Sequence, residues 1–199
     1  MDVVFNSIYA HACMGAGLSV LTGIRAFLPV AFLALYSRLE FASSPVLNDT
    51  FFGFLEKTWV LVLLFALAII EMVVVKLFAV SPLRDQITQP IRIFLGGVVF
   101  AAAVAPEGWI AMVVSGVLGL VIAGLADHVL RSTRKGTSAT KTALVLVSSY
   151  EDILVLIGTL LFVLVPLIGA LLAAFLVLLV YRVRVRGRRK HRGLRILKG

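Results

Sequence analysis

Cysteine, charge and recognisable catalytic motifs are scarce in this chain. Only one of the 199 residues, Cys13, is cysteine, so no disulfide can form within the chain. Charged residues make up 15% of the sequence, against roughly 25% in an average soluble domain. The sequence contains no Ser-His-Asp set, metal-ligand spacing, phosphate-binding loop or dinucleotide fingerprint. These absences exclude a disulfide-stapled fold, and we expect no enzymatic activity, no cofactor and no metal site.

The chain is instead rich in apolar residues. They make up 61% of the chain, and the mean hydropathy is +1.07. A helix that crosses a membrane needs about 20 mostly apolar residues, and several stretches approach that length. The sequence therefore predicts an all-α integral membrane protein, with one transmembrane helical domain over residues 1–181.

Polar interruptions divide the apolar sequence into about six expected spans. Residues 142–181 are too long for one crossing, and we divide them at Pro166. A five-span alternative would need a re-entrant segment at 142–152. Residues 38–57, 81–90 and 131–141 are expected to be polar connections, and 106–108 a tight turn. The six expected spans cover residues 3–36, 59–80, 91–105, 109–130, 142–165 and 167–181.

Basic residues set the expected orientation. The tail, residues 182–199, holds nine of the 19 lysines and arginines and no acidic residue. Short basic segments stay in the cytoplasm, which places the tail and the basic connection 131–141 inside and the turn at 106–108 outside. Six crossings then place both termini in the cytoplasm. We expect the tail to bind anionic lipid headgroups and, without interleaved aromatic residues, no nucleic acid.

The order of the spans allows an inverted repeat of three plus three. Spans one to three would start inside and spans four to six outside, as in many transporters with broken helices. Residues 22–26 of the first span resemble residues 123–127 of the fourth, and the middle span of each half holds an acid. Chance similarity between two glycine-containing apolar segments explains the match equally well.

Arg25 lies within the first apolar segment, between Gly23 and Pro29. Proline removes a backbone donor, so the helix should kink or unwind nearby. An unwound turn exposes peptide groups that can bind an ion or a substrate beside the guanidinium. Arg25 is therefore a candidate binding residue. The alternative is that it pairs with an acid of another span and stabilises the bundle.

Glu71, within the second span, is another candidate. Lys76 follows five residues later, whereas residues three or four apart face each other on a helix. We therefore expect Lys76 to extend toward the interface and Glu71 to find its partner in Arg25. The alternative is that Glu71 faces water near the interface.

A polar cluster interrupts the long run 142–181 and supplies four more candidates. Acids near the centre of a membrane helix cost roughly 2.5–3.5 kcal/mol each, so a chain that keeps two of them is expected to use them. Ser148 and Glu151 also fit a capping box at the start of a helix, whose free N–H groups form a polar end. The candidates are Ser148, Ser149, Glu151 and Asp152.

Asp127 and His128 are secondary candidates near the end of the fourth span. Asp127 and Arg131 are four residues apart and can pair along one helix face. His128 fits an interfacial position as well as a functional one. Arg84 and Arg92 flank the third span, and we interpret them as residues that fix its orientation.

Two segments resemble a known family. Residues 23–29, Gly-Ile-Arg-Ala-Phe-Leu-Pro, and residues 148–152, Ser-Ser-Tyr-Glu-Asp, followed by a long apolar helix with Pro166, resemble the bacterial membrane family catalogued as domain of unknown function 4126. The resemblance covers residues 12 to 180. Where that family tends to have an Asp-Lys pair, this chain has Val75-Lys76. The resemblance implies a multi-pass protein of the bacterial cytoplasmic (inner) membrane and supplies no activity.

Two functions are compatible with these residues. The first is a small transporter or permease, expected to pair as a homodimer, in which Arg25, Glu71, Glu151 and Asp152 form a polar site near the membrane midplane. The acids would carry a proton or cation, and the arginine would hold an anionic group or neutralise an acid. The second is a non-transporting assembly or regulatory subunit with structural charges. Convergence on a water-filled cavity would favour the first function, and a closed ion-paired set the second.

Overall fold

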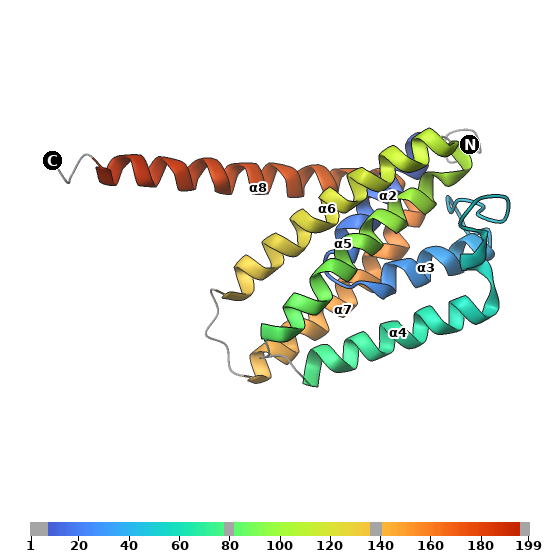
Figure 1. Ribbon diagram of the computed structural model, residues 1–199, viewed down its shortest axis with the longest axis horizontal. Coiled ribbons are helices and arrows are strands. Elements are labelled where there is room, and N and C mark those ends of the chain that lie inside the picture. Colours follow the sequence, from blue (N-terminus) through green and yellow to red (C-terminus); the bar gives the residue numbers. More distant parts are fainter. Residues whose placement is uncertain (1–7, 78–81, 136–140, 196–199) are drawn as a thin grey trace.

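The computed structural model describes residues 8–77, 82–135 and 141–195. In these residues the chain is all helical, with no strand, as the sequence predicts. Seven α-helices and two short 3-10 helices follow one another (Figure 1): α2 Ile8–Thr22, α3 Phe27–Arg38, η1 Gly53–Glu56, α4 Thr58–Leu77, α5 Pro82–Val104, η2 Ala105–Glu107, α6 Trp109–Lys135, α7 Lys141–Leu164 and α8 Pro166–Arg195.

Helices α4 to α8 run back and forth between two ends of the molecule (Figure 1). We call one end the turn end, because the loop 39–57, η2 and the junction between α7 and α8 lie there. We call the other the tail end, because the carboxyl-terminal part of α8 projects beyond the bundle on that side. Helix α8 continues into the basic tail without a break as far as Arg195.

The first apolar segment does not cross the bundle, which corrects the predicted first span. Near the start of α2, His11 Nδ1 lies 3.0 Å from Glu107 Oε1 in η2, at the turn end. Helix α3 returns to the same end, where Ser37 at its last turn bonds the carbonyl of Pro45. Helices of 15 and 12 residues are about 22 and 18 Å long, and neither spans the roughly 30 Å of a bilayer core.

The two short helices therefore form a re-entrant pair, and residues 23–26 are its tip. The predicted break between Gly23 and Pro29 is confirmed, but hydropathy carries no information about the direction of the chain after a break. A side chain at Gly23 would collide with the Ala126 methyl group and the Ala123 carbonyl of α6, so the tip sits directly on that helix. The predicted cytoplasmic amino terminus falls on residues 1–7, outside the described residues.

The remaining predicted elements agree with the structure in part. The division at Pro166 is confirmed, and this proline takes the first position of α8, where its missing N–H costs nothing. The turn at 106–108 is also confirmed, with Gly108 at φ 117°. Residues 82–90, predicted as a polar connection, belong to α5 instead. Residues 78–81 and 136–140 lie outside the described part.

Two further predictions, the inverted repeat and the capping box, do not agree with the structure. The first segment is a re-entrant pair, whereas its proposed counterpart α6 is one continuous helix of 27 residues, so the halves are not inverted copies. The cluster at 148–152 lies inside α7, seven residues or more after its start at Lys141, and is not a capping box. Both predictions relied on local composition, which does not distinguish a helix start from a polar patch within a helix.

Helix α2 occupies the centre of the bundle and packs against α5, α6 and α8. Leu18 and Leu21 are completely buried there, and Gly17 touches the backbone of Gly169 in α8 so closely that no side chain would fit. Small residues at helix crossings allow this close approach within membranes. Because most of α2 is enclosed by these helices, its packing fixes the depth of residues 23–26 in the bundle.

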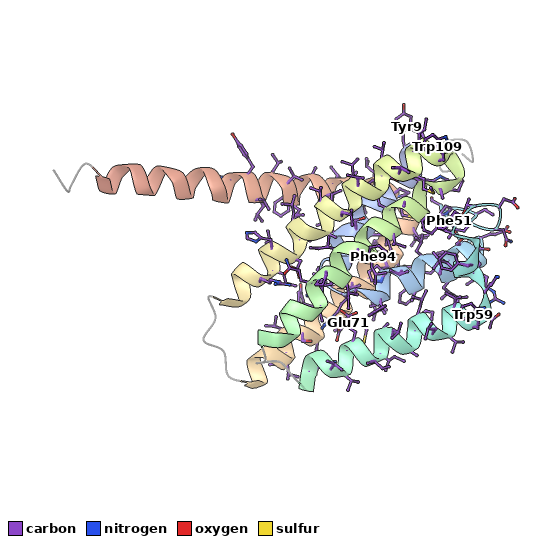
Figure 2. The ribbon with its side chains drawn as sticks, in the orientation of Figure 1. Tyr9, Phe51, Trp59, Glu71, Phe94 and Trp109 are labelled. Carbon is purple, nitrogen blue, oxygen red and sulfur yellow. The ribbon has the colours of Figure 1, made fainter. Side chains whose placement is uncertain are left out.

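The outer surface is apolar over most of the bundle. Three helical segments are long and apolar enough to cross a membrane, Thr88–Glu107, Trp109–Arg131 and Val145–Leu164, and four shorter apolar helices accompany them. Of the second segment, only 22% is buried inside the bundle. Figure 2 shows Trp59 and Trp109 near the turn end, where aromatic residues anchor membrane helices. The chain is a membrane protein.

Candidate functional site

Arg25, at the tip of the re-entrant pair, meets the predicted cluster on α7. Its guanidinium is completely buried, and Nε lies 2.6 Å from Asp152 Oδ1. Nη2 donates to the carbonyl oxygen of Ser148 at 3.0 Å and to its Oγ at 2.6 Å. Glu151 Oε2 lies 3.8 Å from the same nitrogen. Residues three and four apart share one helix face, which explains how a single arginine contacts all three.

Asp152 binds a second cation. Lys76 Nζ, from the end of α4, lies 3.2 Å from Asp152 Oδ2, so each carboxylate oxygen faces one positive charge. The lysine side chain is 39% exposed, while that of the aspartate is 9% exposed. The lysine was expected to extend to the interface; here it points back to an acid and is the one half-open position of the group.

Glu71 caps the start of α3 from another helix. Its carboxylate accepts hydrogen bonds from the backbone N–H of Ala26 at 3.0 Å and of Phe27 at 3.2 Å. The prediction that it pairs with Arg25 is wrong at the level of the side chain, because Glu71 binds the peptide groups that follow the arginine. The positive end of a helix and its free N–H groups attract a carboxylate. Figure 2 shows Glu71 inside the bundle.

A second set of charges joins the first through Glu71. Arg92 Nε lies 3.8 Å from Glu71 Oε1, and Arg92 Nη1 lies 3.3 Å from Asp127 Oδ1. Asp127 Oδ2 also lies 2.8 Å from Arg131 Nε, which confirms the pairing predicted from their spacing. Arg131 Nη1 donates to Gln89 Oε1 at 3.0 Å. The two sets form one connected group across α3, α4, α5, α6 and α7.

Arg92 is a member of this group that sequence reasoning misassigned. It was interpreted as an orientation signal at a helix boundary, but its side chain is 1% exposed. Helix α5 begins at Pro82, so Arg92 lies almost three turns inside it. Because residues 82–90 are polar, the sequence predicted a connection there. It therefore indicated neither the start of α5 nor the depth of Arg92 within it.

We call the connected group the charge layer. It contains four acids and four bases, so its formal net charge is zero when all are ionised: Glu71, Asp127, Glu151, Asp152, Arg25, Lys76, Arg92 and Arg131. Six of these side chains are less than 10% exposed, the exceptions being Lys76 at 39% and Arg131 at 20%. The layer is compact, balanced and nearly closed to solvent.

The layer lies deep in the bundle. Thirteen residues of α4 separate Thr58 from Glu71, and twelve of α7 separate Leu164 from Asp152. At 1.5 Å per residue the layer is about 18–20 Å from the turn end. Asp127, Glu151 and Asp152 fall inside helical segments that are apolar enough to cross a membrane. The charges therefore lie within the lipid-embedded body.

Three other candidates lie apart from the layer. Ser149 is half-buried on α7 and makes no side-chain hydrogen bond to described residues. His128 is exposed on α6. His11 of α2 contacts Glu107, 96 residues away, a pairing that no local spacing could indicate. In the described part of the chain, no group of three or more His, Cys, Asp or Glu is placed to hold a metal ion.

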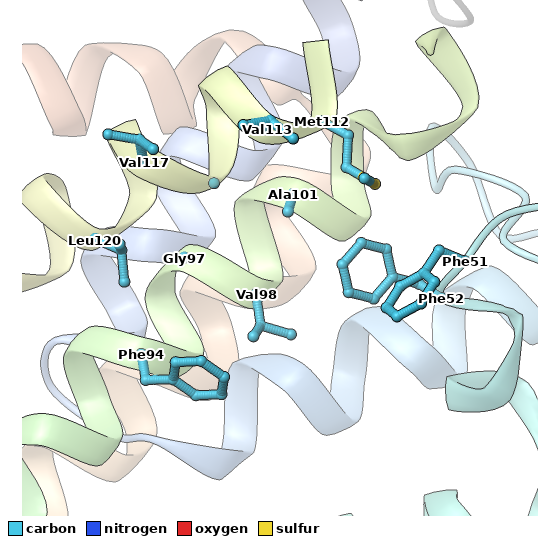
Figure 3. A pocket seen from close by; sticks show the side chains of 11 residues that line it. Phe51, Phe52, Phe94, Gly97, Val98, Ala101, Met112, Val113, Val117 and Leu120 are labelled. Atoms are coloured by element: carbon cyan, nitrogen blue, oxygen red, sulfur yellow. The ribbon is translucent and has the colours of Figure 1, made fainter. Parts of the chain in front are cut away.

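An apolar pocket of about 300 Å³ lies apart from these charges (Figure 3). Phe51 and Phe52 of the loop 39–57 close one side, and residues of α5 and α6, among them Phe94 and Met112, form the rest. No charged residue lines it. Its position on the lipid-facing side of the bundle distinguishes it from the charge layer.

The charge layer can respond to a single added charge. Each acid contacts at least one base, and Asp152 and Asp127 each contact two. Protonation of one carboxylate would leave a buried base without its full counter-charge, which costs several kcal/mol in a low-dielectric interior.

The comparisons with known proteins name one family. The family model described as "Domain of unknown function (DUF4126)" matches residues 12–186, so the chain belongs to this family and the predicted resemblance is confirmed. No curated protein and no solved structure matches the chain. The family description names no activity, so the function has to be inferred from the charge layer.

Proposed function

We propose that the protein is a small proton- or cation-coupled membrane transporter, and that the charge layer is its gate and coupling site. The observation that carries this proposal is the position of Arg25, on the tip of a re-entrant pair inside a balanced layer of buried charges. Broken or re-entrant helices occur within membranes where the backbone is buried in protein or lines a pathway. The proposal assigns no catalytic chemistry to these residues.

Stability alone is a poor reason to keep eight charges in such a place. Replacing a buried ion pair by well-packed apolar residues is often neutral or stabilising, because the desolvation cost of two ions offsets their attraction. Ionisable residues within membrane segments are costly, and they commonly mark substrate paths and proton relays. A charge layer at the tip of a re-entrant pair supports the same interpretation.

Asp152 is the residue at which we place the coupling. It is the acid shared between Arg25, fixed at the tip, and Lys76, which is half-exposed. A proton on Asp152 weakens both contacts at once. Lys76 can then extend toward the interface, as long basic side chains do in membranes, while Arg25 keeps only Ser148 and Glu151.

Loss of the Asp152 contact loosens the tip of the re-entrant pair. The tip is held by Arg25 on one side and by Glu71 on the Ala26 and Phe27 N–H groups on the other. Release of one of these two connections allows α3 to move relative to α7, and the layer then opens to one side. In this state Arg25 is free to hold an anionic group or to return to an acid.

The alternative function is a non-transporting assembly or regulatory subunit. The observation that favours it is that the charge layer is the closed ion-paired set expected of this function, in which Arg25 is 0% exposed and bound to Asp152, Glu151 and Ser148. A permanently closed layer would hold the helices together. The straight continuation of α8 to Arg195 would then offer a platform for a soluble partner or for anionic lipid.

Transport in proteoliposomes separates the two functions. Purified protein is reconstituted with an imposed pH gradient, and uptake of a panel of small solutes is recorded together with the internal pH. The proposal expects solute flux coupled to a change of internal pH. Asp152→Asn should abolish the coupling, while Asp49→Asn, a change at an exposed loop acid, should leave it intact.

The assembly function expects a different set of results. No solute or proton moves with the wild type, and Asp152→Asn lowers the melting temperature without any transport phenotype. Unchanged cellular function of both Arg25→Gln and Asp152→Asn, together with no flux, would overturn the transporter proposal.

A further inference from the structure

A second pocket lies at the turn end, far from the charge layer, and its lining is basic. It has a volume of about 760 Å³ and lies where α3 ends and α4 begins. Its lining consists of Arg38, Asn48, Gly53, Glu56, Lys57, Thr58 and Trp59. We propose that this pocket binds the phosphate-bearing headgroup of an anionic phospholipid.

The charged residues that line the pocket are two cations and one acid, Arg38, Lys57 and Glu56. Among the described residues, neither Arg38 nor Lys57 is within ion-pair distance of a carboxylate. They are also the only lysine and arginine described at the turn end. The lining carries two positive charges and one negative charge, and neither cation has a direct counter-ion, which favours a ligand with negative charge.

The acid of the lining, Glu56, is hydrogen-bonded to the fold and forms no ion pair with either cation. Glu56 Oε1 accepts hydrogen bonds from Ser37 Oγ at 2.5 Å and from the backbone N–H of Leu47 at 2.9 Å. These bonds anchor the loop 39–57 to α3. The carboxylate keeps its negative charge, but Arg38 and Lys57 are left available to a ligand.

Arg38 is held in a position to bind phosphate. Its Nη1 donates to Thr58 Oγ1 at 2.8 Å and to the Glu56 carbonyl at 3.4 Å. Nε and Nη2 make no hydrogen bond to described residues and remain for a ligand. A guanidinium edge binds two phosphate oxygens at once, and Lys57 adds a mobile point charge.

The surroundings favour a lipid over free phosphate. Trp59, which lines the pocket, is 66% exposed (Figure 2), a typical position for an aromatic residue at the level of lipid headgroups. Below it, exposed apolar residues follow one face of α4 at helical spacing: Val62, Leu63, Ile69, Ile70 and Val73. A headgroup in the pocket would place its acyl chains along this face.

A net negative headgroup fits better than a zwitterionic one. The choline group of phosphatidylcholine carries a positive charge that Arg38 and Lys57 would repel. Phosphatidylglycerol has the same phosphate and no such charge. The pocket should therefore distinguish these two lipids although both contain a phosphodiester.

Lipid-dependent thermal stability of the full-length protein in detergent tests the proposal. Phosphatidylglycerol added as mixed micelles should raise the melting temperature of the wild type more than phosphatidylcholine does. Arg38→Gln with Lys57→Gln should lose this difference, with lipid affinity reduced about a hundredfold or more, since two charged contacts of about 1.5 kcal/mol each are lost. Asp49→Asn, which changes an exposed charge of the loop 39–57 but no cation of the pocket, is the control and should keep it.

Three outcomes decide the proposal. Retention of the full phosphatidylglycerol effect in the double variant would overturn it, because the lipid would then act elsewhere. An equal effect of inorganic phosphate alone would show a site for free phosphate and overturn the lipid assignment. Native mass spectrometry keeps the test valid if the double variant is less stable, since the double variant should carry one bound phosphatidylglycerol fewer than the wild type and Asp49→Asn, while lipid bound at the basic tail is unchanged.

Discussion

Among substitutions in the charge layer, we expect replacement of Arg25 by glutamine to lower the free energy of unfolding most. The change removes the 2.6 Å contact with Asp152 and both hydrogen bonds to Ser148. The acid keeps Lys76 at 3.2 Å, but Glu151 loses its contact with the arginine. Excess negative charge therefore stays buried.

The structure gives the size of the effect. Removal of one partner of a buried ion pair costs about 3–5 kcal/mol. For a chain of this length, 1 kcal/mol corresponds to roughly 2–4 °C, so Arg25→Gln should lower the melting temperature by about 6–20 °C. The remaining contact between Lys76 and Asp152 places the expected value in the lower half of this range.

Thermal unfolding in detergent, followed by the fluorescence of Trp59 and Trp109, measures this loss. The matched control Arg182→Gln removes an exposed arginine and should change stability by no more than about 0.5 kcal/mol. The pair Arg25→Gln and Asp152→Asn together should cost less than the sum of the single changes, by about 1–3 kcal/mol. An Arg25→Gln protein that melts within about 2 °C of the wild type would refute the reasoning.

Three further predictions concern packing, capping and chain direction. Gly96→Ala should cost about 1–3 kcal/mol in unfolding free energy, because the added carbon collides with α6, whereas Gly124→Ala has its nearest neighbour at 3.8 Å and should be neutral. Glu71→Gln should speed amide exchange at the start of α3, measured by mass spectrometry; unchanged protection there would contradict the capping role. Cysteines introduced at the exposed residues Tyr9 and Leu39 of a Cys13→Ser protein should be labelled from the same side of the membrane. Labelling from opposite sides would show that the first apolar segment crosses the membrane.

The helical class and most helix boundaries could be predicted because a membrane requires long apolar helices. Pro166 was sufficient to divide the run 142–181, and Gly23 and Pro29 were sufficient to locate a break. The direction of the chain after that break could not be predicted. It depends on the close fit of Gly23 against α6 and on the contact of His11 with Glu107, and both partners lie about 100 residues away.

The sequence predicted most residues of the candidate site, but it predicted their pairing less well. As expected, one arginine meets the polar cluster on α7, because charged groups inside apolar segments are stabilised by pairing. The residues that meet are Arg25, Ser148, Glu151 and Asp152. Glu71 was assigned to the wrong partner, since a carboxylate can satisfy a helix end as well as a side chain. Arg92 was missed because the polar start of α5 looked like a connection.

The central claim is that the charge layer opens, and the accessibility of one introduced cysteine tests it most directly. Ser148→Cys in a Cys13→Ser protein replaces a buried hydroxyl beside Arg25 by a thiol of similar size. Sealed vesicles are treated with a membrane-impermeant thiol reagent, with and without an imposed pH gradient. If the charge layer opens, the thiol is unreactive without the gradient and becomes labelled when the gradient is applied. A thiol that stays unreactive under both conditions, in a protein that remains folded, would contradict it.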